Sequence, residues 1–251
     1  MPDRVPSVDR ALSVLEILAA SRQGLSLSDL SRRLSLPKSS VFLILKTLER
    51  RGYLLRGTAN RRYRFGLQLV TLGHAALSGM KLRDEAAAHL HALARTTGMA
   101  VHLSVLDRSE AVIIEKVEPP GLPRFATWIG RRMDLNCTGA GKALIMHLTS
   151  DEFDRRFRPG SFARHNENSI VSIKRLKIDL AEARARGYAI DDEEDEIGVR
   201  CVGVPVFDGA GAVVAAISVS GTVDKLTTAR IPTVAKAVQR AAQAASGRSH
   251  G

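Results

Sequence analysis

The sequence contains little cysteine, few aromatic residues and no long apolar run. Its 251 residues include two cysteines, Cys137 and Cys201, which are too few for a disulfide framework, so we expect a protein of the reducing cytoplasm. No apolar run approaches the roughly 20 residues that span a bilayer, and no charged-then-apolar leader opens the chain. These absences argue against a membrane protein and against a secreted one.

The residues that are present suit a folded protein with an uneven charge. The chain is 45% hydrophobic and 25% charged, as in ordinary globular proteins, and its length fits one large or two modest domains. The net charge is +11. Residues 1–65 hold 13 Lys and Arg against 5 Asp and Glu, whereas residues 66–251 hold 24 against 21. A basic segment on a near-neutral body indicates a polyanion-binding module joined to a second part; a solvated basic surface is the alternative.

The first fifty residues are predicted to form three helices. Apolar residues recur at helical spacing after Ser7, and Ser26 can cap a short second helix with Asp29 as its partner. The turn Leu36-Pro37 then precedes a third helix. This order of helix, short helix, turn and helix is that of a helix-turn-helix.

The third helix has two faces at about 100° per residue. Its apolar side must pack on a core and carries Val41, Ile44, Leu45 and Leu48. The other side can enter a DNA major groove, where Lys46 and Arg50 would bind phosphates or guanine and Leu43 a thymine methyl. The candidate DNA-binding residues of this helix are Ser39, Ser40, Phe42, Leu43, Lys46 and Arg50. An ordinary amphipathic surface helix is the alternative.

A hairpin is predicted directly after this helix. Residues 53–56 and 62–65 alternate as short strands do, around a turn at 57–61. Beside a helix-turn-helix such a hairpin is a wing, and Arg61 and Arg62 at its tip suit phosphates or a narrow minor groove. A basic solvated hairpin is the alternative.

The remaining chain is predicted to be a linker helix over residues 66–80 and a mixed domain over 81–251. The linker helix has no core of its own, so it would pack on a second copy of the chain or on the wing. Predicted strands cover residues 101–106, 111–117, 199–207 and 212–220, and predicted helices cover 81–97, 139–148, 151–157, 172–186 and 231–245. Hairpins mixed with helices indicate an α+β domain with a mainly antiparallel sheet.

The order of short motifs along the chain resembles that of IclR-family transcription regulators. The motifs are Ser7-Val8-Asp9-Arg10-Ala11-Leu12, Leu36-Pro37-Lys38-Ser39-Ser40-Val41, Leu48-Glu49-Arg50-Arg51-Gly52-Tyr53-Leu54, Ile129-Gly130-Arg131-Arg132, Thr138-Gly139-Ala140-Gly141-Lys142-Ala143-Leu144, Arg186-Gly187-Tyr188, Asp191-Asp192-Glu193-Glu194, Gly198-Val199-Arg200-Cys201-Val202 and Ala216-Ile217-Ser218-Val219-Ser220-Gly221. Each motif is weak by itself, but together they cover nearly the whole chain. One position departs from the family, because Leu43 stands where an arginine is common.

The resemblance implies a winged helix-turn-helix over residues 1–65, joined by a linker helix over 66–80 to a GAF-like effector-binding domain over 81–251. It implies a homodimer or homotetramer on a double-stranded DNA operator, regulated by a small organic effector such as a carboxylate or an aromatic acid. Carried over to this chain, the effector contacts are the backbone N–H groups of Gly139 and Ala140, the side chains of Asp191 and Cys201, and a strand floor of Ser218 and Ser220.

Other residues near the predicted site are interpreted from their chemistry. Phe125, Trp128 and Met133 could form an apolar wall, and a core role is the alternative for Trp128. Arg131 and Arg132 are expected at the surface, and binding of a ligand anion is the alternative. The acidic run at 191–196 is typical of a solvated loop, and only its first residue, Asp191, is expected in the pocket.

Two other classes of protein stay open on the residues alone. The first is a small-acid-converting enzyme that uses Cys201 or Asp191, although no nucleophile–base pair and no metal-ligand spacing such as C-x-x-C supports it. The second is an architectural DNA-binding protein with no ligand. We therefore expect no catalytic residues, no metal ligands and no cofactor.

Overall fold

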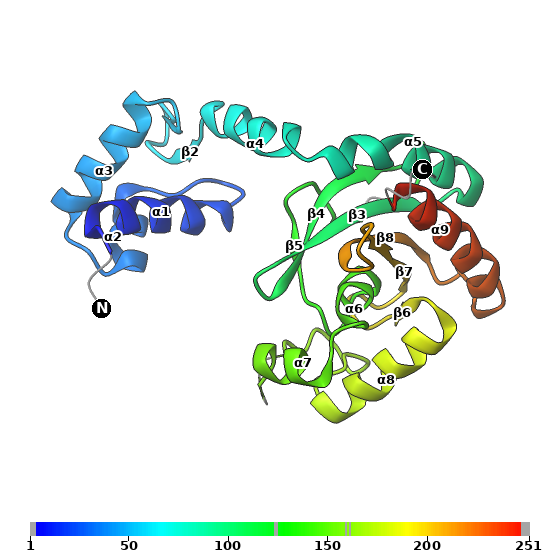
Figure 1. Cartoon of the computed structure of the whole chain (residues 1–251). Helices are drawn as coiled ribbons and strands as arrows, with labels where there is room; N and C mark the ends of the chain where they lie inside the picture. Colours follow the sequence, from blue (N-terminus) through cyan, green and yellow to red (C-terminus); the bar gives the residue numbers. More distant parts are fainter. Residues whose placement is uncertain (1–3, 123–124, 159, 161, 247–251) are drawn as a thin grey trace. The chain divides into compact units, whose positions relative to one another are not determined.

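The computed structural model describes residues 4–122, 125–158, 160 and 162–246. The chain divides into two compact units, the first ending at Gly79 and the second beginning at Met80. Each unit is described by itself (Figure 1). None of the helices in the described ranges has the length and apolar character needed to cross a membrane.

The first unit is a winged helix-turn-helix followed by one further helix, as the sequence predicted. Its elements are α1 (Pro6–Ala19), α2 (Leu27–Leu34), α3 (Lys38–Arg50), β1 (Leu54–Arg56), β2 (Tyr63–Phe65) and α4 (Gln68–Ser78). Strands β1 and β2 pair antiparallel, and an isolated bridge between Leu25 and Tyr63 ties the hairpin to the segment before α2. The wing is therefore fixed to the helices rather than freely attached.

The core of the first unit explains why its helices lie where they do. Its buried apolar residues are Val14, Leu18, Leu25, Leu30, Val41, Leu45, Leu54 and Tyr63. The Ser26 side chain accepts a hydrogen bond from the Asp29 amide while the Asp29 carboxylate accepts one from the Ser26 amide, and this capping box starts α2. Ser35, at φ 53°, makes the left-handed turn toward α3.

The second unit is built on one antiparallel sheet with helices on both faces. The sheet has the strand order β5-β4-β3-β8-β7-β6. Its strands are β3 (Ala100–Asp107), β4 (Glu110–Val117), β5 (Arg132–Met133), β6 (Ala189–Asp192), β7 (Val199–Phe207) and β8 (Val213–Thr222). Helices α5 (Lys81–Thr97) and α9 (Ile231–Ala245) cover one face, and α6 (Gly139–Ile145) packs on the other, with α7 (Ser150–Arg156) and α8 (Ile173–Arg186) beyond it (Figure 1). The expected α+β domain is thus confirmed.

The two edge strands, β5 and β6, were not predicted from the sequence. Strand β5 has two residues, and β6 has four, of which the last two are the first acids of the 191–196 run. Neither strand is long enough for an alternating pattern to show, and acidic residues are uncommon in strands. The missed strand β6 matters because it carries Asp191.

A backbone contact between two glycines places α6 on the sheet. A Cβ atom on Gly203 of β7 would lie 2.1 Å from the carbonyl oxygen of Gly139, the first residue of α6. Only a glycine at 203 lets the helix N-terminus approach the strand this closely. The first turn of α6 therefore rests directly on the sheet backbone.

Replacing Gly203 by alanine should displace α6 and lower the free energy of unfolding of the second unit by about 1–3 kcal/mol. The matched control is Gly209→Ala, because a Cβ there meets nothing within 4 Å. Urea unfolding of the full chain, followed by the fluorescence of its single tryptophan, Trp128, measures both variants in this unit. Equal midpoints for the two variants would contradict the proposed role of the glycine contact.

Candidate functional site

The exposed face of α3 carries the residues predicted to contact DNA. Val41 and Leu45 are buried, whereas Leu43 is 64% exposed and Phe42 is 42% exposed. The polar members of the predicted set are Ser39, Lys46 and Arg50, which are exposed, and Ser40, which is half-buried. The helix thus presents two basic side chains and two large apolar ones to solvent, the mixture that suits a DNA groove.

The two wing arginines have different surroundings. Arg61 is exposed and adopts the left-handed conformation at φ 49° in the hairpin turn. Arg62 is half-buried, and its guanidinium donates to the carbonyl oxygen of Gly24 at 2.9 Å. Arg62 therefore holds the wing against the turn before α2, a structural role that the sequence did not indicate.

In the second unit a polar cavity of about 40 Å³ lies over the sheet beside the N-terminus of α6. It is lined by eight of the nine residues predicted for the effector site, namely Phe125, Met133, Gly139, Ala140, Asp191, Cys201, Ser218 and Ser220. Its other polar lining residues are His102, Thr127, Arg131, Thr138, Asp195 and Glu196.

Strand pairing brings the floor of the cavity together. Asp191 of β6 pairs with Cys201 of β7, which pairs with Ser220 of β8, so the three residues form one row across the sheet. Two residues farther along β8, Ser218 pairs with His102 of β3. Because residues two apart point to the same face of a strand, both rows face the cavity.

The N-terminus of α6 forms one wall of the cavity. Thr138 caps the helix by accepting a hydrogen bond from the Gly141 amide at 3.1 Å, and its hydroxyl donates to the Asp134 carbonyl at 2.7 Å. The amides of Gly139 and Ala140 belong to the first turn, where an α-helix supplies no carbonyl partner. These two N–H groups are therefore suited to an anion in the cavity.

Burial shifts the ionisation of two cavity side chains. It raises the pKa of Asp191 to about 7, even though the carboxylate accepts hydrogen bonds from the amides of Glu194 (2.8 Å) and Asp195 (3.4 Å). Burial, together with nearby Lys116 and Arg131, lowers the pKa of His102 to about 3. At neutral pH the cavity thus contains a neutral imidazole and a carboxyl group that is about half protonated.

His102 was not predicted as a residue of the effector site. Its imidazole Nε2 lies 3.0 Å from the Thr127 hydroxyl, and the residue is 2% exposed. The sequence did contain a signal. His102 and Ser104 are two residues apart on the apolar strand predicted at 101–106, so both polar side chains lie on the same strand face. The pairing of His102 with Ser218 across the sheet could not be predicted, because the two residues are far apart in the sequence.

The expectation that Arg131 lies at the surface was wrong. Arg131 lines the cavity, and its guanidinium is 3.4 Å from the Asp195 carboxylate. The pair links the segment before β5 to the turn between β6 and β7, which residue spacing alone could not show. Arg132, the next residue, is exposed as expected and pairs with Asp107 and Glu110.

The interpretation of residues 191–196 as a solvated loop was wrong for Glu194, whereas Asp192 and Glu196 are exposed as expected. Glu194 is 7% exposed and its carboxylate lies 2.7 Å from the ammonium group of Lys142, which is fully buried. Asp179 of α8 lies 3.1 Å from the same ammonium group. Burial raises the pKa of Glu194, and Lys142 counteracts that shift. Glu194 therefore turns inward because a buried cation requires counter-charges.

The structure does not place Trp128 on the cavity. Its side chain is 59% exposed, and the Arg131 guanidinium lies 5.8 Å from its ring centroid. The Arg131 amide donates to the Trp128 carbonyl at 3.0 Å across Gly130, which has φ 89°. This tight turn directs Arg131 into the cavity and leaves Trp128 outside it.

The geometry at Cys201 does not resemble that of a catalytic thiol. Its sulfur lies 3.0 Å from the Ser220 hydroxyl, and burial together with Asp191 raises the pKa of the thiol above its usual range. A nucleophilic cysteine needs a lowered pKa and an adjacent base. Cys201 is therefore suited to lining the cavity.

A winged helix-turn-helix joined to a separate α+β domain is the architecture of a class of protein, the DNA-binding transcriptional regulators. Residues 7–57 match the IclR helix-turn-helix domain, and residues 74–247 match the domain described as bacterial transcriptional regulator IclR C-terminal. The chain belongs to the IclR family. It is a transcriptional regulator and not an enzyme, since the related proteins carry the names of regulators and repressors.

Similar proteins match the chain over most of its length. It is 35% identical to the HTH-type transcriptional regulator XynR of Escherichia coli over 96% of each chain, and 34% identical to KdgR of the same organism over 87% of this chain and 83% of KdgR. The Thermotoga maritima IclR structure matches with a TM-score of 0.77 at 30% identity, covering 96% of this chain and 98% of that one. An IclR homologue from Microbacterium hydrocarbonoxydans, complexed with 4-hydroxybenzoate, shares the fold at 23% identity and a TM-score of 0.80 over 95% of this chain and 97% of that one.

Replacing Lys142 by methionine should destabilise the second unit by about 3–5 kcal/mol, because the buried Glu194 and the partly buried Asp179 would lose their counter-charge. Lys177→Met is the control, since Lys177 and Asp154 form an exposed ion pair worth at most about 1 kcal/mol. Thermal or urea unfolding of both variants measures the difference. If Lys142→Met lowers the free energy of unfolding no more than Lys177→Met does, the buried ion pair is not required for the stability of this unit.

Proposed function

We propose that this regulator binds an operator through α3 and the wing, and that a small organic acid in the polar cavity modulates this binding. The observation that carries the proposal is the composition of the cavity. One arginine, two helix-terminal amides, two serines and a buried histidine surround the buried carboxyl group of Asp191, whose pKa burial raises to about 7. Asp195 and Glu196 complete the polar lining. This set suits a ligand that bears both a carboxylate and an apolar part.

The α3 helix reads the major groove and the wing contacts the backbone. Lys46, Arg50 and Arg61 supply charge to the phosphates, and Ser39 and Ser40 at the start of the helix supply hydroxyl groups. The exposed Leu43 and Phe42 offer apolar contacts to thymine methyl groups rather than the arginine–guanine contact that the family pattern favours. We therefore expect an operator rich in A·T pairs at the position that Leu43 reaches.

The effector carboxylate is bound by Arg131 and by the amides of Gly139 and Ala140. The rest of the ligand contacts the floor of the cavity, which is formed by Ser218, Ser220 and Cys201. Phe125 and Met133 form an apolar wall beside it. The IclR homologue with 4-hydroxybenzoate supports an aromatic acid as one candidate, because the same fold accommodates such a ligand. A protonated Asp191 donates a hydrogen bond instead of repelling the anion.

Effector binding must rearrange the wall, because about 40 Å³ holds only roughly three water molecules. The Arg131–Asp195 ion pair joins two segments of that wall. A bound carboxylate competes with Asp195 for Arg131, so the two segments separate when the effector enters. A ligand that favours the separated arrangement shifts the population toward it and thereby changes the affinity for DNA.

The regulator acts as a homo-oligomer, a dimer or a tetramer. Helix α4 has no buried residue; Val70 within it is 67% exposed, and Leu67 at its N-cap is 78% exposed. A helix without a buried face is stable when a second copy covers its apolar side. We assign residues 1–65 to DNA binding, 66–80 to the linker helix and 81–251 to the effector domain, and two-fold symmetry would match paired operator half-sites.

Two substitutions on α3 should separate charge from base contact. Lys46→Ala should reduce the slope of log affinity against log salt by about one per protomer, with weakening on any DNA. Leu43→Ala should leave that slope unchanged and cost about 1 kcal/mol on the specific site alone. Electrophoretic shifts on the DNA upstream of its own gene, across a salt series, measure both effects.

The control for both variants is Lys174→Ala, an exposed position on α8 in the second unit, which should bind as the parent does. Absence of salt-sensitive and sequence-preferring DNA binding by the parent protein would overturn the proposed function as a whole.

The affinity for an effector carboxylate should depend on pH through Asp191. Above about pH 7 its carboxyl group becomes charged and repels the anion, so the dissociation constant should rise by about tenfold from pH 6 to pH 8. Asp191→Asn keeps a hydrogen-bond acceptor for the Glu194 amide and removes the charge, so its affinity should not vary over this range.

A thermal-shift screen of small carboxylates that includes 4-hydroxybenzoate identifies the probe, and calorimetry on the best ligand supplies the pH series. If no carboxylate stabilises the protein, the cavity does not bind this class of ligand. If parent affinity is equal at both pH values, Asp191 does not face the anion.

A further inference from the structure

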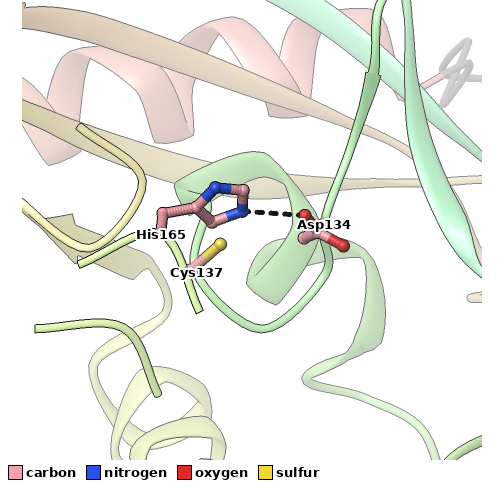
Figure 2. Close-up of side chains that lie close together, drawn as sticks. All are labelled: Asp134, Cys137 and His165. Atoms are coloured by element: carbon pink, nitrogen blue, oxygen red, sulfur yellow. Dashed lines mark hydrogen bonds and ion pairs between the residues drawn. The ribbon is translucent and has the colours of Figure 1, made fainter. Parts of the chain in front are cut away.

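Three potential metal ligands from two segments of the second unit lie together outside the polar cavity. The imidazole Nε2 of His165 is 2.9 Å from the Asp134 carboxylate, and the Asp134, Cys137 and His165 donor atoms all lie within 4.8 Å of one another (Figure 2). None of these side chains lines the polar cavity. No metal-ligand spacing is visible in the sequence, because Cys137 and His165 are 28 positions apart.

We propose that Asp134, Cys137 and His165 form a binding site for a divalent transition cation of the zinc type. One oxygen, one sulfur and one imidazole nitrogen form a mixed donor set that suits zinc, and calcium or magnesium would require oxygen ligands almost throughout. Water would complete a tetrahedral shell at a fourth position. None of the three ligands belongs to the proposed effector site, although Asp195 of the cavity wall lies next to His165.

The distances fit such a shell after a small adjustment. Metal–ligand bonds of about 2.0–2.3 Å in a tetrahedron place donor atoms roughly 3.3–3.8 Å apart. The observed separations range from 2.9 Å to less than 4.8 Å, so changes of about 1 Å would convert the hydrogen-bonded arrangement into a coordinated one. Asp134 and His165 are 39% and 36% exposed, and side chains with this exposure have room to move.

The backbone around the three ligands is already held in place. Asp134 and Cys137 share the turn before α6, which the Thr138 hydroxyl closes by donating to the Asp134 carbonyl. The amide of His165 donates to the Ser169 hydroxyl, which in turn donates to the Glu194 carbonyl at 2.8 Å. Fixed second-layer hydrogen bonds of this kind reduce the entropy lost when a metal binds.

Charge around the cluster favours a cation. The Asp134 carboxylate belongs to the cluster, and the carboxylate of Asp195, which also pairs with Arg131, lies 3.8 Å from His165 Nε2. The thiol of Cys137 is buried. Metal coordination would take its thiolate form and release the proton to solvent.

Cobalt(II) titration of the full chain tests the site, because a thiolate bound to cobalt gives a charge-transfer absorption in the near ultraviolet. The parent protein, stripped with a chelator, should show this band at one equivalent of cobalt per chain and lose it on addition of zinc. Cys137→Ser should abolish the band, whereas Cys201→Ser, which changes the other thiol, should retain it.

His165→Gln provides an independent variant at a partly exposed position, where the fold should tolerate the change. It should weaken zinc binding by about tenfold or more in competition with a chromophoric chelator, and His91→Gln, an exposed histidine on α5, should leave it unchanged. A parent protein without the cobalt–thiolate band, or a band that survives in Cys137→Ser, would overturn the proposed site.

Discussion

The ammonium group of Lys142 lies among protein atoms with no access to water, and a charge in that position needs its counter-charges within contact distance. Glu194 and Asp179 provide them from the β6–β7 turn and from α8. One ion-pair cluster therefore joins three segments that are far apart in the chain. This cluster fixes the position of the β6–β7 turn. The same turn supplies the Glu194 and Asp195 amides that donate to Asp191, and the Asp195 carboxylate that pairs with Arg131.

The periodic elements of this protein could be predicted from sequence, but the long-range contacts could not. The α3 faces, the hairpin at 53–65 and the strands at 101–117 and 199–222 follow from local apolar spacing, which is why those predictions match the fold. Strand β6 is short and acidic, so local propensity argues against it. It forms because its neighbour β7 pairs with it and because Lys142 neutralises the charge of the turn that follows.

The candidate site shows the same division. Glycines, serines and Asp191 were found through motifs, and the sheet register then placed them in adjacent rows. Trp128 and Arg131 were assigned to the wrong sides because one turn through Gly130 decides which of them faces inward. By composition both are loop residues, and composition does not indicate the direction in which either side chain points. The cluster of Asp134, Cys137 and His165 depends on a loop return that no local pattern encodes.

The contact between Gly139 and Gly203 has a consequence for how such a regulator can change its ligand. A wall made of two backbones carries no side chain, so substitutions cannot adjust it gradually; they either preserve it or break it. Divergence in ligand preference within this architecture must therefore arise elsewhere, at Phe125, Met133 and the strand positions of the floor. The anion-binding corner would remain constant while the rest of the cavity varies, so related regulators could respond to different acids through a shared way of binding the acid group.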